Sequence, residues 1–514
     1  MSHRHLRRTA AALVLAAAAA LPAAAQQTPP PPPPAPPAPL APPNGPTLTL
    51  EQALDSARTH NPGLLTPRNE SRTARAAVRE ARMSFLPSAS VSTGVGYTAP
   101  GEQRFGSVQL ESSSPAYYSS SYGLSFDYQM SGAKLMQPTL ARAQRRATEQ
   151  RIVGYEANVV SEVRQQYLAS LQALEQAGQA ERELARTREH ERLARARLDV
   201  GAGTPLDLRR AEVERGQAEV NLLQRRNTYQ TELLRLGQAM GAPLAPGTRL
   251  VSTFALFEPA WTVDELVALA LAGNPNLLSA RASAEAARTG VRAARSQYLP
   301  SLGLNVGYRG SVYSAGSLDP LYQTKINNAN STFKGCVYNN QLGALIGAAP
   351  DDCSPFDTSN PAVVAGLKQQ VRAANPSFPF GFRGQPMQAS LSVSLPLFNG
   401  WARERNVEEA RVQRDNAELA VRGQELKLRT DLGSALLNLQ TAYGVAQLQA
   451  QVVGRATEEL RLAQERFRFG VASSVEVTDA QTSLALAEQG RIDAIYNYHK
   501  SLAALEALAG RPLR

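Results

Sequence analysis

The most reactive side chains in this sequence are two thiols, Cys336 and Cys353, among 514 residues. They lie close together in a stretch that has the composition of a loop. Two lone thiols at this separation in a large exported protein predict one local disulfide. A metal or redox pair is the alternative, but the spacing matches no zinc-binding pattern.

Histidines, the usual general bases, are also few. Two of the five stand at the start of the chain, and His60, His190 and His499 fall in helical stretches. No serine, cysteine or metal-ligand constellation accompanies them, and no glycine-rich phosphate loop is present. We therefore expect no catalysis, no bound metal and no cofactor.

Acidic residues follow two glycines, Gly201 and Gly470, that interrupt long helical stretches. An acid three residues after a threonine or serine can complete a capping box at the start of a helix. The pairs with this spacing are Thr204 with Asp207 and Ser473 with Glu476. Asp479 has no capping partner of this kind, so its carboxylate is free for another role.

The first residues place the chain in an exported compartment. Residues 1–25 combine an arginine-rich start, an apolar run at Ala10–Leu21 and a small-residue cleavage site, which is typical of a signal peptide. The proline-rich residues 26–47 predict an extended tether without a packed core. The net charge of +10 is spread over helical arginines interleaved with glutamates, which argues against nucleic-acid binding.

The mature chain uses one unit twice, over residues 48–247 and 248–514. Both copies contain an Asn-Pro pair, a helix ending at Leu-Pro, a strand ending at Gly-Tyr, and a Gly-containing turn before the last helix. The first copy predicts a helix at 50–86, strands at 88–97 and 122–131, a long helix at 134–200 and a return helix at 205–240. The second predicts a helix at 262–299, strands at 301–312 and 386–397 around a long outer loop, a long helix at 401–469 and a return helix at 474–509.

The four predicted strands alternate between an apolar face and a small, polar face. The alternation is clearest at 386–397, where Met387, Leu391 and Leu395 share one face. Each strand has about ten residues, the length that crosses an outer membrane at a tilt. Four strands cannot close a barrel, and open edges are not tolerated in lipid, so the barrel must be shared between copies. A half-buried soluble sheet is the alternative for any single strand.

The two long helices exceed what a globular domain needs. At 1.5 Å per residue, about 65 residues reach roughly 100 Å. Leu432, Leu436, Leu439 and Tyr443 follow heptad spacing, which indicates coiled-coil packing.

The duplicated order of these elements resembles the TolC family of outer-membrane factors over about residues 48–510. The resemblance is carried by the Asn-Pro pairs, the Leu-Pro helix ends, and the runs Leu395-Pro396-Leu397-Phe398-Asn399-Gly400 and Phe469-Gly470 to Asp479-Ala480-Gln481. It implies a mixed α/β membrane fold: a homotrimer whose twelve-stranded outer-membrane β-barrel continues as a periplasmic α-helical tunnel. Its implied role is the exit duct of a tripartite efflux pump or type I secretion system. The implied partners are outer-membrane lipid, a periplasmic adaptor and an inner-membrane pump or secretion transporter.

The resemblance also assigns roles at the two turns. Acids that match Glu476 and Asp479 line the narrowest part of the pore in family members, and Asp207 is the matching acid of the first copy. Three acids around a narrow axis would attract cations and disfavour anions. Gly201 and Gly470 are the implied adaptor contacts, although their backbone role in turning the chain is equally important. Family members can carry an arginine that locks the closed state where this chain has Ala472.

A periplasmic coiled-coil adaptor or scaffold is the competing interpretation. The alternating strands argue against it, as does the lack of an adaptor-like β-barrel or lipoyl-like domain in the sequence.

Overall fold

The computed structural model describes residues 45–105, 108–252 and 254–513. The predicted signal peptide, 1–25, lies outside these residues, and so does all of the predicted tether, 26–47, except its last three residues. At its end Thr47–Leu48 forms β1, which pairs in parallel with β6 at Arg249–Leu250. The end of the predicted tether is therefore a short strand fixed against the link between the two repeats.

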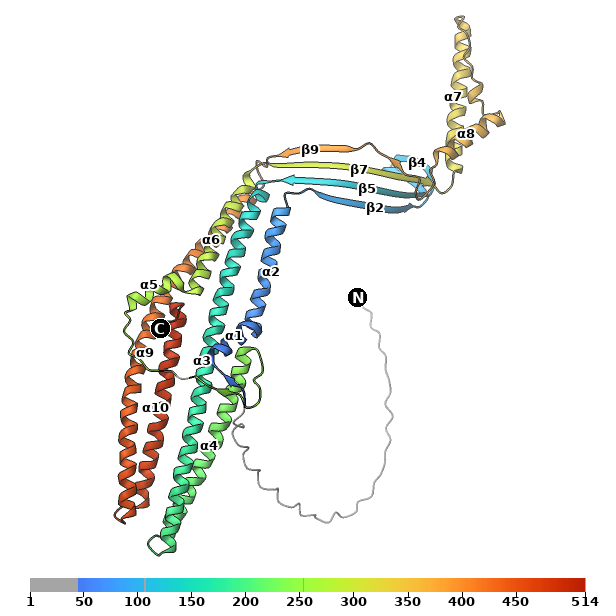
Figure 1. Cartoon of the computed structure of the whole chain (residues 1–514). Helices are drawn as coiled ribbons and strands as arrows, with labels where there is room; N and C mark the ends of the chain where they lie inside the picture. Colours follow the sequence, from blue (N-terminus) through green and yellow to red (C-terminus); the bar gives the residue numbers. More distant parts are fainter. Residues whose placement is uncertain (1–44, 106–107, 253, 514) are drawn as a thin grey trace, which may run out of the picture.

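The two repeats have the same order of helices and strands (Figure 1). In the first they are α1 (Leu50–His60), α2 (Pro62–Met83), β2 (Ser88–Thr98), β5 (Tyr117–Met130), α3 (Gly132–Asp199) and α4 (Pro205–Met240). In the second they are α5 (Val263–Gly273), α6 (Pro275–Arg295), β7 (Ser301–Ala315), β9 (Gln388–Ser394), α9 (Ala402–Arg468) and α10 (Ser474–Ala509). A 3₁₀ turn, η1 (Ser296–Tyr298), follows α6. With 68 and 67 residues, α3 and α9 reach about 100 Å.

The helices predicted at 50–86 and 262–299 are each broken in two, at Asn61 and Asn274. Asn61 accepts from the Gly63 amide at 2.7 Å and donates its side-chain amide to the Ala239 carbonyl at 2.6 Å. Asn274 does the same with Leu277 and Leu508, both at 2.9 Å. A proline follows each asparagine and restricts it to extended backbone, so the first helix ends there and a new one begins.

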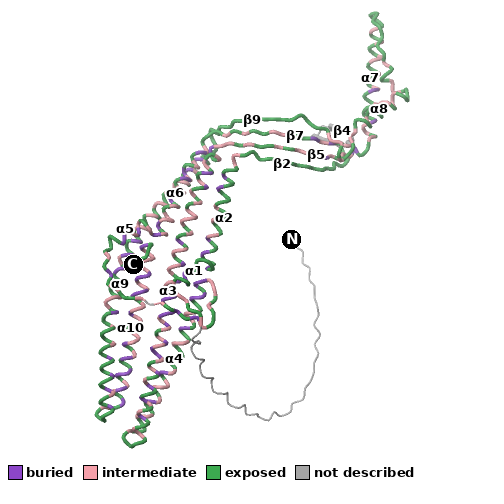
Figure 2. The backbone as a smooth tube through the Cα atoms, viewed as in Figure 1, coloured by how far each residue is buried: buried purple, intermediate pink, exposed green. Residues whose placement is uncertain are grey.

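The four long strands form one antiparallel sheet in the order β2-β5-β7-β9, with β8 (Arg383–Gly384) pairing the outer end of β7. The sheet is extended and curved, and the long helices leave one of its ends (Figure 1). β2 and β9 are its edges, and their residues are exposed along their whole lengths (Figure 2). Each edge strand therefore has one side without a hydrogen-bonding neighbour.

The register places apolar and polar residues on opposite faces of the sheet. One row of facing residues is Tyr128, Leu304 and Leu391, and another is Ala89, Phe126, Val306 and Ala389. On the other face Ser90 bonds Ser125 at 2.7 Å and Arg309 bonds Gln388 at 3.1 Å. Val91, Phe126 and Leu391 are 81%, 45% and 67% exposed, so no described segment of the chain packs over this part of the apolar face.

The end of the sheet away from the helices carries two insertions. In the first repeat β3 (Gly101–Phe105) pairs with β4 (Val108–Ser114). In the second, where a long loop was expected, the chain forms α7 (Asp319–Leu345), the 3₁₀ turn η2 (Ser354–Phe356) and α8 (Pro361–Ala374). Cys336 and Cys353 form a disulfide with a Cα–Cα distance of 5.8 Å, which ties α7 to the segment before α8.

Each long helix packs against its return helix through an apolar seam. Ala456, Leu460, Val477 and Leu484 belong to the seam of α9 and α10, and Ala180, Leu184, Ala218 and Leu222 to that of α3 and α4. Two larger apolar clusters join these hairpins to α1 and to α5. Buried residues accordingly follow the helix contacts (Figure 2). Among the described residues, no helix has a stretch apolar enough to span a bilayer.

We predict that Asn274→Ala lowers the free energy of unfolding by about 2 kcal/mol, because it removes an N-cap and leaves the partly buried Leu508 carbonyl without its donor. The thermal midpoint of the detergent-solubilised protein measures the change. Asn276→Ala is the matched control. Asn276 is exposed and only bonds Asn158 at 3.3 Å, so its loss should cost no more than about 0.5 kcal/mol. Equal midpoints for both variants would contradict the role given to Asn274.

Candidate pore constriction at the hairpin tips

The two hairpin tips have the same backbone geometry. Gly201 and Gly470 follow the ends of α3 and α9 with φ of 75° and 78°. The next amides, of Ala202 and Val471, donate back to the carbonyls of Arg197 and Arg466 at 2.8 and 2.9 Å. This is a Schellman closure, and its left-handed residue favours glycine. Both glycines are exposed, with no atom within 4 Å of a Cβ added to them, so the backbone angle is what requires glycine here.

Asp207 occupies the capping position that the sequence predicts. Its carboxylate accepts from the Thr204 hydroxyl at 2.6 Å and backbone amide at 3.2 Å, which completes a capping box. It also accepts from the Ser474 hydroxyl of the second hairpin at 2.5 Å. The hydrogen bonds from Ser474 and Thr204, with a smaller contribution from Arg210, hold the pKa of Asp207 below its ordinary value. Asp207 therefore caps α4 and joins the two hairpins.

The capping box predicted for Ser473 with Glu476 is wrong. Ser473 makes no side-chain capping bond, and Glu476 instead pairs with Arg466 of α9 at 2.5 Å. Arg466 lies in the last turn of α9 and brings a full positive charge close to the tip, so the Glu476 carboxylate pairs with it instead of capping α10. Both side chains remain substantially exposed, at 57% and 39%, so this ion pair adds little to stability.

Asp479 lies one helical turn beyond Glu476 on α10 and is exposed. Among the residues that the structure describes, its carboxylate has no ion pair and no hydrogen bond. Of the three predicted pore acids, Asp479 is thus the one whose charge is not already used within the chain. Across the described residues, no group of three or more His, Cys, Asp or Glu is arranged to hold a metal ion.

Further contacts join the tips, and the sequence reasoning missed them. The Thr478 hydroxyl of α10 donates to Glu214 of α4 at 2.6 Å. Arg197 donates to the Phe467 carbonyl at 2.6 Å, and its guanidinium lies 4.3 Å from the centre of the Phe467 ring. We call Asp207–Ser474, Glu214–Thr478 and Arg197–Phe467 the tip contacts. None of these three contacts involves Ala472, the position at which the family resemblance implied an arginine.

His190 lies beneath the tip contacts and is 5% exposed. Its ring stands 5.8 Å from that of Phe467, and its Nε2 has no hydrogen-bonding partner among the described residues. Burial lowers the pKa of His190, while Glu214 and Asp207 oppose that shift in part. The histidine therefore packs as a neutral aromatic ring, as expected of an isolated helical histidine.

Above the tips, the two hairpins meet through polar residues. Arg186 forms two bonds with Glu488, at 3.1 and 2.9 Å. Gln172 and Gln176 both donate to Asp493 at 2.6 Å. A further pair, Arg164 with Glu506 at 2.5 Å, closes the upper end. We call this line the polar seam, in contrast to the apolar seams inside each hairpin.

Apolar side chains are also exposed at the extreme tips. Val200, Phe469 and Val471 are 78%, 84% and 69% exposed beside the two glycines. Exposed hydrophobic residues that cluster in this way are typical of a protein–protein contact surface. A sequence signal for them existed, because each tip glycine is flanked by apolar residues in an otherwise charged stretch.

The family model described as "Outer membrane efflux protein" matches residues 53–242 and 359–511, well over half of the chain. The outer membrane efflux protein BepC of Brucella suis is 30% identical over 184 residues, which are 36% of this chain and 38% of that protein. The matched region thus spans well under half the length of this curated relative.

Solved structures share the fold over nearly the whole chain. The outer membrane protein VceC of Vibrio cholerae aligns with a TM-score of 0.62 at 16% identity, over 90% of this chain and 97% of that one. The CmeC outer membrane channel of Campylobacter jejuni aligns with a TM-score of 0.65 at 15% identity, over 90% and 85%.

These matches decide between the interpretations left open by the sequence. They support neither a periplasmic adaptor nor a scaffold, and a family of efflux channels confirms the expectation that the chain is not an enzyme. The two repeats, the long helical hairpins and the membrane strands all fall within the shared fold. The chain belongs to the outer membrane efflux protein family.

Proposed function

We propose that this protein is the outer-membrane exit channel of a tripartite efflux system. The observation that carries the proposal is the four-stranded sheet with an exposed apolar face and two unpaired edges, joined to helices of about 100 Å. Such a sheet is stable in lipid only when its edges are paired by further copies. The helices are long enough to carry a passage from the barrel deep into the periplasm.

The assembly that we propose is a homotrimer with a twelve-stranded barrel. In it β2 of one copy pairs with β9 of the next, since these are the two free edges. The apolar rows face lipid, and the serine-rich face, with Asp127 and Asn305, lines the water-filled interior. The number of copies, three, is taken from the family. The two unpaired edge strands are the reason that more than one copy is needed.

The hairpin tips are the proposed contact with a periplasmic adaptor, which joins the channel to an inner-membrane pump. Gly201 and Gly470 shape both tips, and the exposed Val200, Phe469 and Val471 provide the apolar contact area. Because these side chains are exposed in the isolated chain, a docked adaptor would gain their burial.

The proposed constriction is formed by acids of the second tip. Asp479 faces the axis as the principal charge, while Glu476 and Asp207 stand beside it and are held by Arg466 and Ser474. The tip contacts hold the second hairpin against the first and thereby keep the passage narrow. Opening requires these polar contacts to separate while each hairpin stays intact through its apolar seam.

Purified protein in planar bilayers should form a cation-selective pore of low conductance. Asp479→Ala should shift the permeability ratio of K⁺ over Cl⁻ towards parity, because the ring of unpaired carboxylates is lost. Glu476→Ala should have a smaller effect, since Arg466 already neutralises that acid. Asp264→Ala removes an exposed acid of α5, far from the tips, and serves as the control. An Asp479→Ala pore with the selectivity of wild type would remove Asp479 from the constriction while leaving the channel intact.

Ser474→Ala should raise the ratio of open to closed channels by about tenfold, because it removes a hydrogen bond to a charged carboxylate. Ser483→Ala, on the exposed side of the same helix, should leave that ratio unchanged. Single-channel records give the open fraction directly. If both variants conduct like wild type, the tip contacts do not hold the closed state.

Acidification should open the wild-type channel only below about pH 3.8, the ordinary pKa of an aspartate. The pKa of Asp207 is depressed, so its stabilisation of the closed tip is complete at neutral pH and is lost as pH falls through that lower value. Asp207→Asn should lack this acid step, and Asp264→Asn should retain it. Conductance measured from pH 7 to pH 3 tests the step, and its persistence in Asp207→Asn would assign it to another group.

A further inference from the structure

Aromatic side chains gather at the outer end of the sheet, the end away from the long helices. Tyr118 and Tyr122 alternate along β5 with Phe126 and therefore share its apolar face. The ring centres of Tyr97 and Tyr118 lie 5.2 Å apart across β2 and β5, and those of Tyr122 and Tyr308 lie 6.0 Å apart across β5 and β7. The apolar face thus ends outward in a group of tyrosines.

The segment at 376–382, between α8 and β8, folds back over these tyrosines. The ring of Phe378 lies 5.5 Å from that of Tyr118. The ring of Phe382 meets that of Tyr122 edge-on at 5.0 Å. We call residues 376–382 the aromatic loop, because it places its phenylalanines on the tyrosines of the apolar face.

Hydrogen bonds fix the aromatic loop in this place. Ser120 lies on the apolar face between the two tyrosines of β5, and its hydroxyl donates to the Pro379 carbonyl at 2.5 Å. The loop covers Ser120, which is 4% exposed. Within the loop the Gly381 amide donates to the Ser377 carbonyl at 2.7 Å, which closes a tight turn. The loop is therefore seated on the sheet and does not extend freely from it.

The tip of the aromatic loop is a side chain that no described segment covers. Phe380 is 83% exposed, whereas Phe378 is 39% exposed and Phe382 is half-buried. The aromatic loop carries no charged residue. A ring of this size loses a large apolar area to water when it is left uncovered, so its exposure points to a partner of apolar chemistry.

The position of the loop along the strands matches the edge of a membrane. The long helices extend into the periplasm, so the other end of the sheet faces outward. β5 has 14 residues, which cover roughly 30 Å of height at about 3.3 Å each and a tilt of about 45°. The apolar band of an outer-membrane barrel is about 25 Å tall and ends in aromatic residues. Tyr118, the second residue of β5, therefore falls at the outer boundary of that band.

Positive charge accompanies the loop in the sequence. Residues 358–386 contain Lys368, Arg372 and Arg383 and no acidic residue. Lys368 and Arg372 are exposed on α8 and lie 5.7 and 5.8 Å from the centre of the Tyr322 ring. Exposed aromatic rings with nearby cations are typical of segments that bind a membrane surface, where anionic headgroups lie above acyl chains.

The strand on which the loop is seated argues against a second copy of this chain as its partner. In the proposed barrel the copies meet at β2 and β9, the two edges. The aromatic loop instead covers Tyr118 and Tyr122 of β5, an inner strand. Pairing of the edges therefore leaves Phe380 uncovered.

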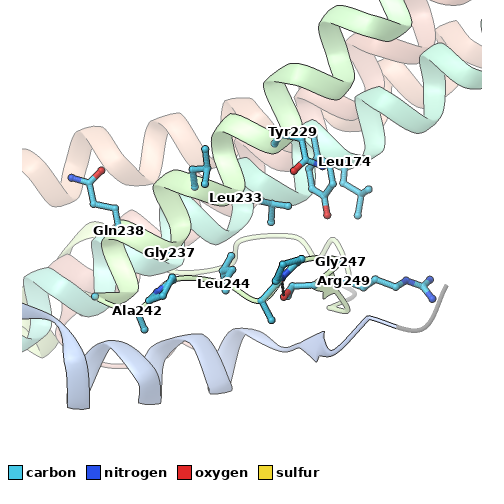
Figure 3. Close-up of a pocket in the computed structure, with 16 residues that line it drawn as sticks. Leu174, Tyr229, Leu233, Gly237, Gln238, Ala242, Leu244, Gly247 and Arg249 are labelled. Atoms are coloured by element: carbon cyan, nitrogen blue, oxygen red, sulfur yellow. Dashed lines mark hydrogen bonds between the residues drawn. The ribbon is translucent and has the colours of Figure 1, made fainter. Parts of the chain in front are cut away.

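Another apolar surface of the chain has a different setting. A cavity of about 680 Å³ lies beside α4 and is lined by Leu174, Leu233 and Leu244, among others (Figure 3). It belongs to the helical part, which is periplasmic, so the outer leaflet does not reach it. The aromatic loop, in contrast, continues the rows of the sheet that are proposed to face lipid.

We propose that the aromatic loop lies in the outer leaflet of the outer membrane, with the Phe380 ring among the lipid acyl chains. The inference rests on the proposed barrel, because a sheet that faces lipid is what brings the loop to the membrane. The loop then fixes the depth of the outer end of the sheet. It also holds the insertion of α7 and α8 at the membrane surface.

Spin labels test the inference in the full-length protein, reconstituted in vesicles of phosphatidylcholine and phosphatidylglycerol. The two cysteines of the chain form a disulfide, so Phe380→Cys supplies the thiol that reacts with a nitroxide label. Collisions of the label with oxygen and with a polar nickel complex report its surroundings. The ratio of oxygen to nickel collisions should be at least about tenfold higher at Phe380→Cys than at Leu345→Cys, because hydrocarbon excludes the polar complex.

Leu345→Cys is the matched control. Leu345 is 81% exposed, nearly the same as Phe380, and belongs to the same insertion. It lies at the end of α7, away from the sheet, so its label should meet water (Figure 1). A label at Phe380 that meets the nickel complex as often as one at Leu345 would place the loop in water and overturn the inference. A label that meets neither reagent would place Phe380 in a protein contact, which overturns it as well.

Val91→Cys separates this inference from the proposed channel. Val91 is 81% exposed on the apolar face of β2, so its label must meet oxygen in any barrel that crosses the membrane. Lipid at Val91 with water at Phe380 would leave the barrel intact and reject the insertion of the loop alone. Water at both positions would reject the barrel, and the inference with it.

Discussion

The backbone edges of β2 and β9 are the constraint on which the rest of the molecule depends. Among the described residues each of these strands pairs on one side only, and the sheet between them exposes an apolar face that no described segment covers except at its outer end. An unpaired edge in lipid costs several kcal/mol for each unsatisfied group. The proposed homotrimer removes this cost, because β2 of one copy pairs with β9 of the next. The position of each strand also fixes where the next long helix starts, because α3 and α9 each begin within a few residues of the strand that precedes them.

The helical part divides its contacts by chemistry. Within each hairpin the seam is made of Ala, Leu and Val, whose burial is lost as a whole if the helices part. Between hairpins the seam is polar, with Arg186–Glu488 and the pair of glutamines on Asp493. Polar pairs can exchange their partners for water at a much smaller net cost than a buried apolar seam. In the proposed opening each hairpin moves as a unit and the polar seam separates, and the tip contacts lie at the free end of that seam.

Much of this architecture could be predicted from the sequence, because local signals dominate it. The repeat, the strand alternation and the long helices each extend over many residues, so no single misjudged position changes them. The breaks at Asn61 and Asn274 have a local signal, the proline after each asparagine, but the bonds from these asparagines to carbonyls 178 and 234 residues away could not be predicted from the sequence. The capping role predicted for Glu476 is wrong for a related reason. The spacing of a capping box is a local pattern, whereas Arg466, which binds the Glu476 carboxylate instead, lies on another helix. The contacts of Ser474 and Thr478 with α4 depend wholly on how the hairpins meet, which no local pattern encodes.

The two repeats share their helices and strands but differ in the segments that precede α1 and α5. A repeated unit keeps its helix and strand pattern because that pattern buries the core, but each copy meets a different neighbour at its ends. The second copy is preceded by a linker in which the Phe257 ring contacts Trp261 and the Phe257 carbonyl accepts a hydrogen bond from Tyr498. This linker is held at both ends by folded repeats. At the corresponding place of the first copy, β1 pairs Thr47 with Arg249 and Leu48 with Leu250 of the link. The hairpin of the first repeat is thus entered through a short parallel strand, and that of the second through an aromatic cluster of Phe257, Trp261 and Tyr498.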